Sequence, residues 1–236
     1  MGWAYFKVGS ICDVVRGGSP RPAGDPHFYG GSIPFLKVAD ITRSDGIRLS
    51  SHAYTITEAG LPKTRLTAPE TLLISNSGAT LGVPKICTFE TTFNDGIAAF
   101  LGLSSEELEF HYYFWESKTA SLRAINQGAA QPNLNTAILS ELPIPICSRE
   151  ETAEVVTRIS CLLSVSDTVL TGLEQQMAYV PALRQSILKK AFSGQLVPQD
   201  PNDEPASVLL ERIRAEKQQD TSGPRKSRKR EKEMVS

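Results

Sequence analysis

Histidine and cysteine are scarce in this sequence of 236 residues, which has three of the former and four of the latter. The histidines stand alone, with no spacing that would bring two of them to one metal ion: His27, His52 and His111. The cysteines lack the paired spacing of a zinc site and the density of a secreted disulfide scaffold: Cys12, Cys87, Cys147 and Cys161. We therefore expect no metal site, and reduced, mostly buried thiols.

Long apolar runs and catalytic signatures are also lacking. The apolar runs stop short of the roughly 18 residues that a membrane span requires, and no signal peptide begins the chain, so we expect a cytoplasmic protein. No glycine-rich nucleotide loop is present, because Gly17-Gly18 and Gly30-Gly31 are predicted to be turns. The methyl-transfer signature and the acidic nuclease pattern are missing as well. These absences indicate a binding protein without catalytic activity of its own.

The net charge of −1 hides an uneven distribution. Residues 221–236 carry six basic and two acidic side chains, and residues 1–85 carry nine basic and six acidic ones. The basic tail has the composition of a disordered arm, and either a nonspecific nucleic-acid contact or a solvated terminus explains it. Any nucleic-acid surface on the remainder must be a local patch.

Residues 1–147 are predicted to form a mixed α+β domain, because short apolar runs alternate with Gly, Asn and Pro turns. The predicted strands are Phe6–Val8, Ile11–Val15, Ile33–Val38, Thr71–Ser75, Val83–Cys87 and Ile97–Leu103. Ser104 and Glu107 form a capping box before an aromatic-rich helix whose aromatics favour the core. Shorter helices are expected over Ser121–Asn126 and between Asn135 and Leu139. An extended Leu142–Ile146 connector follows, since each proline disfavours helix before it.

Residues 148–194 are predicted to form one long coiled-coil helix. Its apolar residues alternate at steps of four and three, with Ser166 and Gln176 as polar members of the seam. The seam consists of Val155, Ile159, Leu162, Val169, Leu173, Val180, Leu183 and Ile187. A second row widens the stripe: Val156, Leu163, Leu170 and Met177. We expect a kink or break near Pro181, a bridge and short helix over 195–217, and a disordered tail over 218–236.

Polar residues at the predicted strand ends are the candidates for recognition. Arginine can bind guanine or phosphate, and paired amides suit the edge of adenine. The same residue types are also ordinary loop formers and helix caps, so both explanations stay open. The candidate DNA-binding residues are Arg16, Ser19, Arg21, Lys37, Asn76, Ser77, Thr80, Asn126, Gln127, Gln131 and Asn133.

Several short motifs together resemble the target recognition domain of a type I restriction-modification specificity subunit. They are Gly2-Trp3, Val8–Ile11, Gly17–Pro20, Ile33–Lys37, Leu72–Ser75 with Gly78 and Gly82, Asn94–Ala98, and Gly128–Asn135 leading into Leu142–Pro145. Leu183–Leu196 is similar to the end of the long helix of that family. The resemblance extends to about Lys217.

The resemblance implies a non-catalytic subunit that reads half of a bipartite site in double-stranded DNA. It implies methyltransferase partners carrying S-adenosylmethionine and a restriction or motor subunit using ATP, with no cofactor in this chain. Family members usually hold two recognition domains and two long helices, whereas this chain has one of each. We therefore expect either a half subunit that dimerises through the seam or the C-terminal half of a longer protein. A coiled-coil scaffold with a protein-binding head is the alternative.

Overall fold

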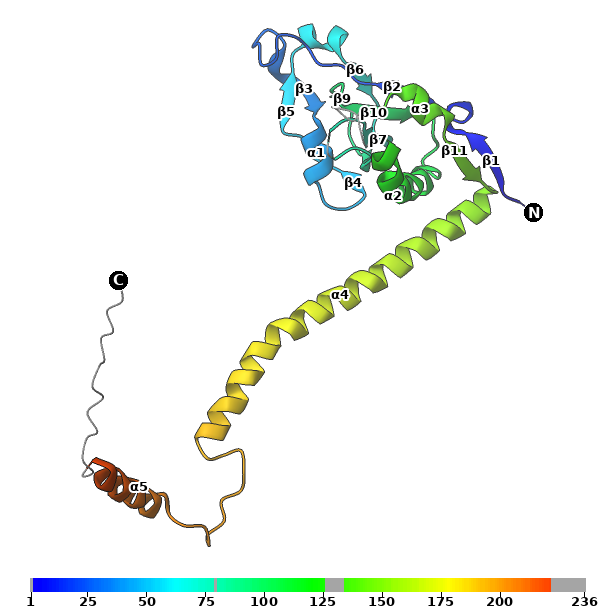
Figure 1. The fold of residues 1–236 in the computed structure, drawn as a ribbon. Coiled ribbons are helices and arrows are strands. Elements are labelled where there is room, and N and C mark those ends of the chain that lie inside the picture. The colour runs from blue at the N-terminus through cyan, green and yellow to red at the C-terminus, as the bar shows by residue number, and fades with distance from the viewer. Residues whose placement is uncertain (1, 79, 126–133, 222–236) are drawn as a thin grey trace, which may run out of the picture. The chain divides into compact units, whose positions relative to one another are not determined.

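The computed structural model describes residues 2–78, 80–125 and 134–221 (Figure 1). The chain divides into two units, Met1–Ser166 and Asp167–Ser236. The first unit contains residues 2–147 and the beginning of a long helix. We call residues 2–147 the recognition domain after the family that the sequence resembles. The expected combination of an α+β domain followed by a long helix is confirmed.

Three sheets build the recognition domain. The central sheet has five strands in the order β2-β10-β7-β8-β4. A four-stranded sheet has the order β5-β3-β9-β6, and β1 pairs with β11 in a two-stranded sheet. The strands are β1 (Ala4–Lys7), β2 (Asp13–Arg16), β3 (Tyr29–Leu36), β4 (Arg48–Leu49), β5 (Tyr54–Ile56), β6 (Arg65–Thr67), β7 (Thr71–Ser75), β8 (Pro84–Cys87), β9 (Thr91–Phe93), β10 (Ile97–Leu101) and β11 (Pro143–Ile146).

Helices connect and cover these strands. The α-helices of the domain are α1 (Val38–Arg43), α2 (Leu108–Ile125) and α3 (Thr136–Glu141), and the 3₁₀ helices are η1 (Val8–Ser10) and η2 (Glu58–Lys63). Ser104 and Glu107 interact before α2 as predicted, since the Ser104 hydroxyl donates to the Glu107 carboxylate at 2.7 Å. The prediction of a separate helix over Ser121–Asn126 was wrong, because residues 121–125 continue α2 without a break.

The core of the recognition domain lies between the central sheet and α2. Trp115 is fully buried and stacks on Phe100 of β10 at a ring centroid distance of 4.8 Å. Phe110 and Tyr112 are also buried, so the prediction that the α2 aromatics belong to the core is confirmed for these residues. Among the four cysteines, Cys12 and Cys87 are buried, but Cys161 is exposed on the long helix, so the expectation of mostly buried thiols holds for half of them.

The long helix α4 runs from Arg149 to Phe192 and contains 44 residues. Its first turns pack on the recognition domain: Thr152 is buried, and Val155 and Val156 contact the core. Val155, a residue of the predicted seam, is therefore partly buried against the domain of its own chain. Pro181 lies inside the continuous helix, which excludes the predicted break into two helices, whereas a kink at Pro181 stays a prediction.

Most of the α4 seam is uncovered in the single chain. Leu162 is 70% exposed and Leu173 is 52% exposed, and Val169, Val180, Leu183 and Ile187 are exposed as well. By length and composition alone, α4 is also apolar enough to cross a membrane, whereas the short apolar runs predicted no membrane span. The heptad spacing of its apolar residues is the pattern of a helix that packs against another helix.

After α4, Gly194 adopts a positive φ of 72° that suits glycine at the end of a helix. The bridge ends at α5, which runs from Ala206 to Thr221. Helix α5 thus includes residues 218–221, which were assigned to the tail from sequence. The remainder of the basic tail, 222–236, lies outside the described residues.

Candidate nucleic-acid interface

The turn formed by Asn94, Asp95 and Gly96 lies where several strand ends meet. The backbone amide of Asn76, after β7, donates to the Gly96 carbonyl at 2.9 Å. The backbone amide of Asn94 donates to the Leu36 carbonyl of β3 at 2.9 Å. The Gly17 amide after β2 donates to the carbonyl of Ile97 in β10 at 3.0 Å. The ends of β2, β3 and β7 therefore gather around one turn, which we call the hub turn.

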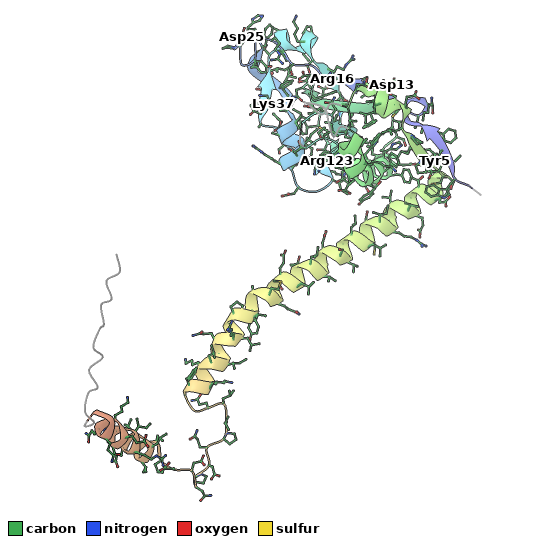
Figure 2. All side chains as sticks on the ribbon, in the orientation of Figure 1. Tyr5, Asp13, Arg16, Asp25, Lys37 and Arg123 are labelled. Atoms are coloured by element: carbon green, nitrogen blue, oxygen red, sulfur yellow. The ribbon has the colours of Figure 1, made fainter. Side chains whose placement is uncertain are left out.

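Two predicted recognition residues are attached directly to the hub turn. Arg16 donates from Nε to the Asp95 carbonyl at 2.6 Å, and Ser19 donates from its hydroxyl to the Asp95 carboxylate at 2.6 Å. Arg16 is exposed and lies at the end of β2 (Figure 2). Arg21 is exposed in the segment that follows. The Gly17–Arg21 loop is thus anchored at its start by both backbone and side-chain contacts.

Lys37 lies between β3 and α1. It directly follows Leu36, whose carbonyl accepts a hydrogen bond from the Asn94 backbone amide of the hub turn. Its backbone amide donates to the Asp40 carboxylate at 2.8 Å, which caps α1. Its ammonium lies over the ring of Tyr54 at 3.5 Å from the centroid. The contact orients Lys37 without neutralising its charge, because an aromatic ring carries no net charge.

The loop after β7 places its polar residues at different depths. Asn76 is fully buried, and within the described residues neither its side-chain nitrogen nor its oxygen has a hydrogen-bond partner. A direct contact of Asn76 with DNA is therefore not available in this conformation. Ser77 is half-buried near Gly96, where an added Cβ would lie 2.8 Å from the Ser77 hydroxyl oxygen. Thr80 is exposed, so Ser77 and Thr80 remain the accessible candidates of this loop.

The predicted amide-rich loop falls mostly outside the described residues. Its four candidates cannot be placed: Asn126, Gln127, Gln131 and Asn133. Its end is anchored beneath the hub turn, because the Leu134 amide donates to the Asn76 carbonyl at 2.8 Å. Asn135 accepts a bond from the Ile138 amide at 2.8 Å and caps α3, which confirms the capping explanation for this residue.

Sequence reasoning missed a basic depression of about 370 Å³ beside the Gly17–Arg21 loop. It is lined by Arg16, Gly17, Gly18, Pro62, Lys63, Thr64 and Arg65. Lys63 ends η2 and Arg65 begins β6, so neither follows a strand that could be predicted from its apolar pattern. The available signal was the net positive charge of residues 1–85.

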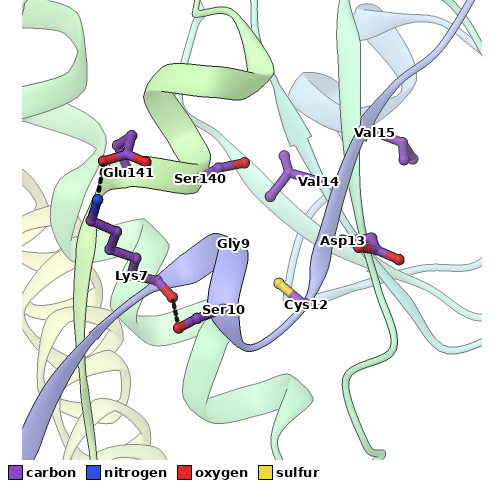
Figure 3. Close-up of a pocket in the computed structure, with 9 residues that line it drawn as sticks. All are labelled: Lys7, Gly9, Ser10, Cys12, Asp13, Val14, Val15, Ser140 and Glu141. Carbon is purple, nitrogen blue, oxygen red and sulfur yellow. Dashed lines mark hydrogen bonds and ion pairs between the residues drawn. The ribbon is translucent and has the colours of Figure 1, made fainter.

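Three other cavities lined by described residues each include acidic side chains. One of them, about 550 Å³, lies beside η1 and α3 and contains the ion pair Lys7–Glu141 at 2.6 Å (Figure 3). Burial raises the pKa of the Cys12 thiol in this cavity to about 11, which keeps it protonated and unreactive. A smaller cavity of about 140 Å³ lies between α2 and α4 and contains His111. Burial lowers the pKa of His111 to about 4.

Comparisons with known proteins give a consistent result. The family model described as type I restriction modification DNA specificity domain matches residues 1–177. The MjaIX specificity subunit of Methanocaldococcus jannaschii is 26% identical over 80% of this chain and 44% of its own length. The EcoDI specificity subunit of Escherichia coli is 30% identical over 62% of this chain and 36% of its own length.

A solved structure supports the fold. The HsdS subunit from Thermoanaerobacter tengcongensis is 21% identical to this chain and superimposes with a TM-score of 0.58 over 83% of it and 46% of that subunit. The chain spans less than half the length of each of these relatives.

Proposed function

Because this chain belongs to the family of type I restriction-modification DNA specificity domains, we propose that it recognises a DNA sequence for a partner methyltransferase. The observation that carries the proposal is the convergence of the ends of β2, β3 and β7 on the hub turn. A rigid scaffold that presents polar loop residues at one place is the usual arrangement for recognition. The scaffold alternative is not favoured, since the family model covers the whole recognition domain.

Accessible residues around the hub turn would read the bases. Lysine, serine and threonine side chains form hydrogen bonds with base edges in the major groove. Lys37, Ser77 and Thr80 provide these groups, and Ser19 and Arg21 extend the same region. The amides at 126, 127, 131 and 133 are proposed to add adenine contacts, because carboxamides match the donor and acceptor pair of that base.

The seam of α4 suggests how the second half of a bipartite site is reached. We propose that it packs against the equivalent helix of a second copy, or of the other half of a longer subunit, and holds two recognition domains apart. Methyltransferase subunits carrying S-adenosylmethionine and a motor subunit using ATP would supply the catalysis, and this chain would supply none. The assembly would act in the cytoplasm.

Methylome sequencing of cells that contain this chain and its methyltransferase tests recognition. A bipartite methylated motif that disappears when this chain is deleted is the expected result. Two identical inverted half-sites are expected for a homodimer, because two-fold symmetry of the protein imposes two-fold symmetry on the DNA. An asymmetric motif excludes the homodimer, and a motif independent of the chain excludes recognition.

Single substitutions test the individual readers. Lys37→Gln, Arg21→Ala and Gln131→Ala are expected to alter or abolish the methylated motif. The first replaces an ammonium with a carboxamide, and the other two remove a hydrogen-bonding group from the reading loops. Lys118→Gln is the matched control, since Lys118 lies on α2 with its ammonium near Phe114 of the same helix and belongs to none of the reading loops. Unchanged motifs in all three variants would exclude these loops as readers.

A further inference from the structure

We propose that the basic depression lined by Arg16, Lys63 and Arg65 binds phosphate groups of the DNA backbone. The inference rests on the proposed function and deepens it, because it separates a part that holds the duplex from the part that reads bases. The chemical class of the ligand is the phosphodiester, and its source is double-stranded DNA. Among the described residues, no acidic side chain lines the depression.

The walls of the depression are held close together through Phe93. The Phe93 carbonyl accepts a bond from the Gly18 amide at 3.0 Å and another from the Thr64 hydroxyl at 2.8 Å. The loop after β2 and the start of β6 are thus attached to the same atom of β9. Residues 16–18 and 63–65 therefore form two walls with fixed spacing.

Two glycines make this close approach possible. A Cβ at Gly18 would lie 2.3 Å from the Lys63 carbonyl oxygen, and one at Gly17 would lie 2.3 Å from the backbone oxygens of Phe93 and Asn94. Any side chain at these positions would therefore push the walls apart. The two glycines explain why basic residues separated by nearly fifty positions in the sequence line one depression.

Each of the two arginines is oriented by its Nε atom, which donates a hydrogen bond to a backbone carbonyl. Arg65 donates from Nε to the Arg16 carbonyl at 2.8 Å, and Arg16 donates from Nε to the Asp95 carbonyl at 2.6 Å. Both acceptors are neutral backbone oxygens, so neither contact neutralises a positive charge. The terminal nitrogens form no hydrogen bond within the described residues and remain available for a bidentate contact with phosphate oxygens.

Several other cations of the chain are paired with carboxylates, whereas three cations that are unpaired within the described residues line this one depression. Lys7 pairs with Glu141, Arg48 with Glu70 and Glu109, and Arg149 with Glu106. Across the described residues, Arg16, Lys63 and Arg65 form no ion pair. The Asp95 carboxylate accepts from the neutral Ser19 hydroxyl and keeps its charge, but it does not line the depression. The depression thus presents concentrated positive charge on a nearly neutral protein, as an anion site requires.

Phosphate contacts fix the position of a protein on DNA but carry no direct sequence information. Loss of a cation in the depression should therefore weaken binding to every duplex equally. Each phosphate contact contributes about 0.9 to the slope of log affinity against log salt concentration. At 0.1 M salt this corresponds to about eightfold in affinity for each contact.

The test uses the full chain with its methyltransferase subunit and a fluorescent duplex of random sequence. Affinity is measured by anisotropy between 50 and 200 mM KCl for wild type, Lys63→Gln and Lys63→Gln/Arg65→Gln. We expect about eightfold and sixtyfold losses at 0.1 M salt, with the slope falling by about one and two units. Methylome sequencing of both variants should give the wild-type motif, at reduced occupancy.

Two controls separate charge from packing. Lys118→Gln removes the same charge elsewhere and should leave affinity and slope unchanged. Arg65→Lys keeps the charge but loses the Nε contact with Arg16, so it should retain most of the salt dependence. Lys63→Gln breaks no hydrogen bond within the described residues, so we expect this variant to fold. A loss of its DNA affinity then reports the loss of charge.

Three outcomes overturn the assignment: an unchanged slope in the double variant, an equal loss in Lys118→Gln, or an altered methylated motif. The last would make these residues base readers. If the wild-type assembly binds no duplex at all, the proposed function itself fails. Wild-type binding together with unaffected variants refutes only the phosphate site.

Discussion

The recognition domain and the seam of α4 contain similar apolar residues in opposite environments. Trp115 in the domain is fully buried, whereas Leu162 and Met177 on α4 are 70% and 74% exposed. The domain buries its own apolar surface in two clusters, while α4 beyond Ser160 buries none of its large apolar side chains. The domain therefore has what it needs to fold alone, and the helix requires a partner to remove its seam from water.

The seam provides the largest expected effect. If α4 forms the proposed dimer, Leu162→Glu/Val169→Glu/Leu173→Glu should abolish it, because three charges per helix would be buried without partners in the interface. Light scattering after size exclusion should report the monomer mass. Gln175→Glu, outside both apolar rows, is the control and should remain dimeric. A triple variant with the wild-type mass would exclude α4 as the interface.

The core of the domain should respond independently of the seam. Trp115→Ala removes the ring that stacks on Phe100, and the cavity left behind should lower the free energy of unfolding by about 3 to 5 kcal/mol. Urea denaturation followed by far-ultraviolet circular dichroism measures it. Met177→Ala is the matched change on α4 and should leave the transition of the domain unchanged. Equal losses in both variants would contradict the contrast between the two regions.

His111 gives the domain a specific dependence on pH. Its pKa of about 4 in the folded state lies below the unfolded value near 6.5, so the unfolded chain binds its proton first as pH falls. Stability from this group is complete above pH 6.5, declines between pH 6.5 and 4, and levels off below pH 4. Glu107, which directly precedes α2, and Arg149 on α4 line the same cavity.

His111→Gln should remove that part of the pH dependence, up to about 3 kcal/mol between pH 7 and 4. Urea melts at several pH values measure the difference from wild type, and this comparison cancels the carboxylates common to both proteins. Parallel stability curves for the two proteins would show that His111 is not the titrating group.

The smallest effect is expected at the start of α2. Ser104→Ala removes the hydroxyl that donates to Glu107 and should cost about 1 kcal/mol of domain stability. The Ser104 hydrogen bond is also the main reason that the pKa of Glu107 lies below its usual range. Carboxyl titration by NMR should show that pKa rising toward normal in the variant, and an unchanged value would refute the contact.

Elements governed by local pattern could be predicted from sequence. Strand β7 has the predicted bounds Thr71–Ser75 because all five of its residues are buried and apolar or small. The α4 heptads and the Asn135 cap depend likewise on neighbours in the chain. The long helix expected from residue 148 begins at Arg149, shortly after the proline-rich β11 ends at Ile146.

Elements defined by distant partners could not be predicted. Strands β5, β6 and β9 have three residues each and depend on distant pairing, because β5 and β9 pair with β3 and β6 pairs with β9. Lys63 and Arg65 joined the candidate interface only through the close approach of Gly18, a contact that no periodicity encodes. The depth of Asn76 also depends on Gly96 and Leu134, which are far away in sequence.

The pairing of β1 with β11 has a consequence for how such proteins diversify. Ala4 lies opposite Ile146 and Lys7 opposite Pro143, so the polypeptide enters and leaves the recognition domain through two adjacent antiparallel strands. Two recombination points in this ribbon would exchange the entire reading module as one cassette. A gene could thereby acquire a new target while its α4 seam, and with it the choice of assembly partner, is inherited unaltered.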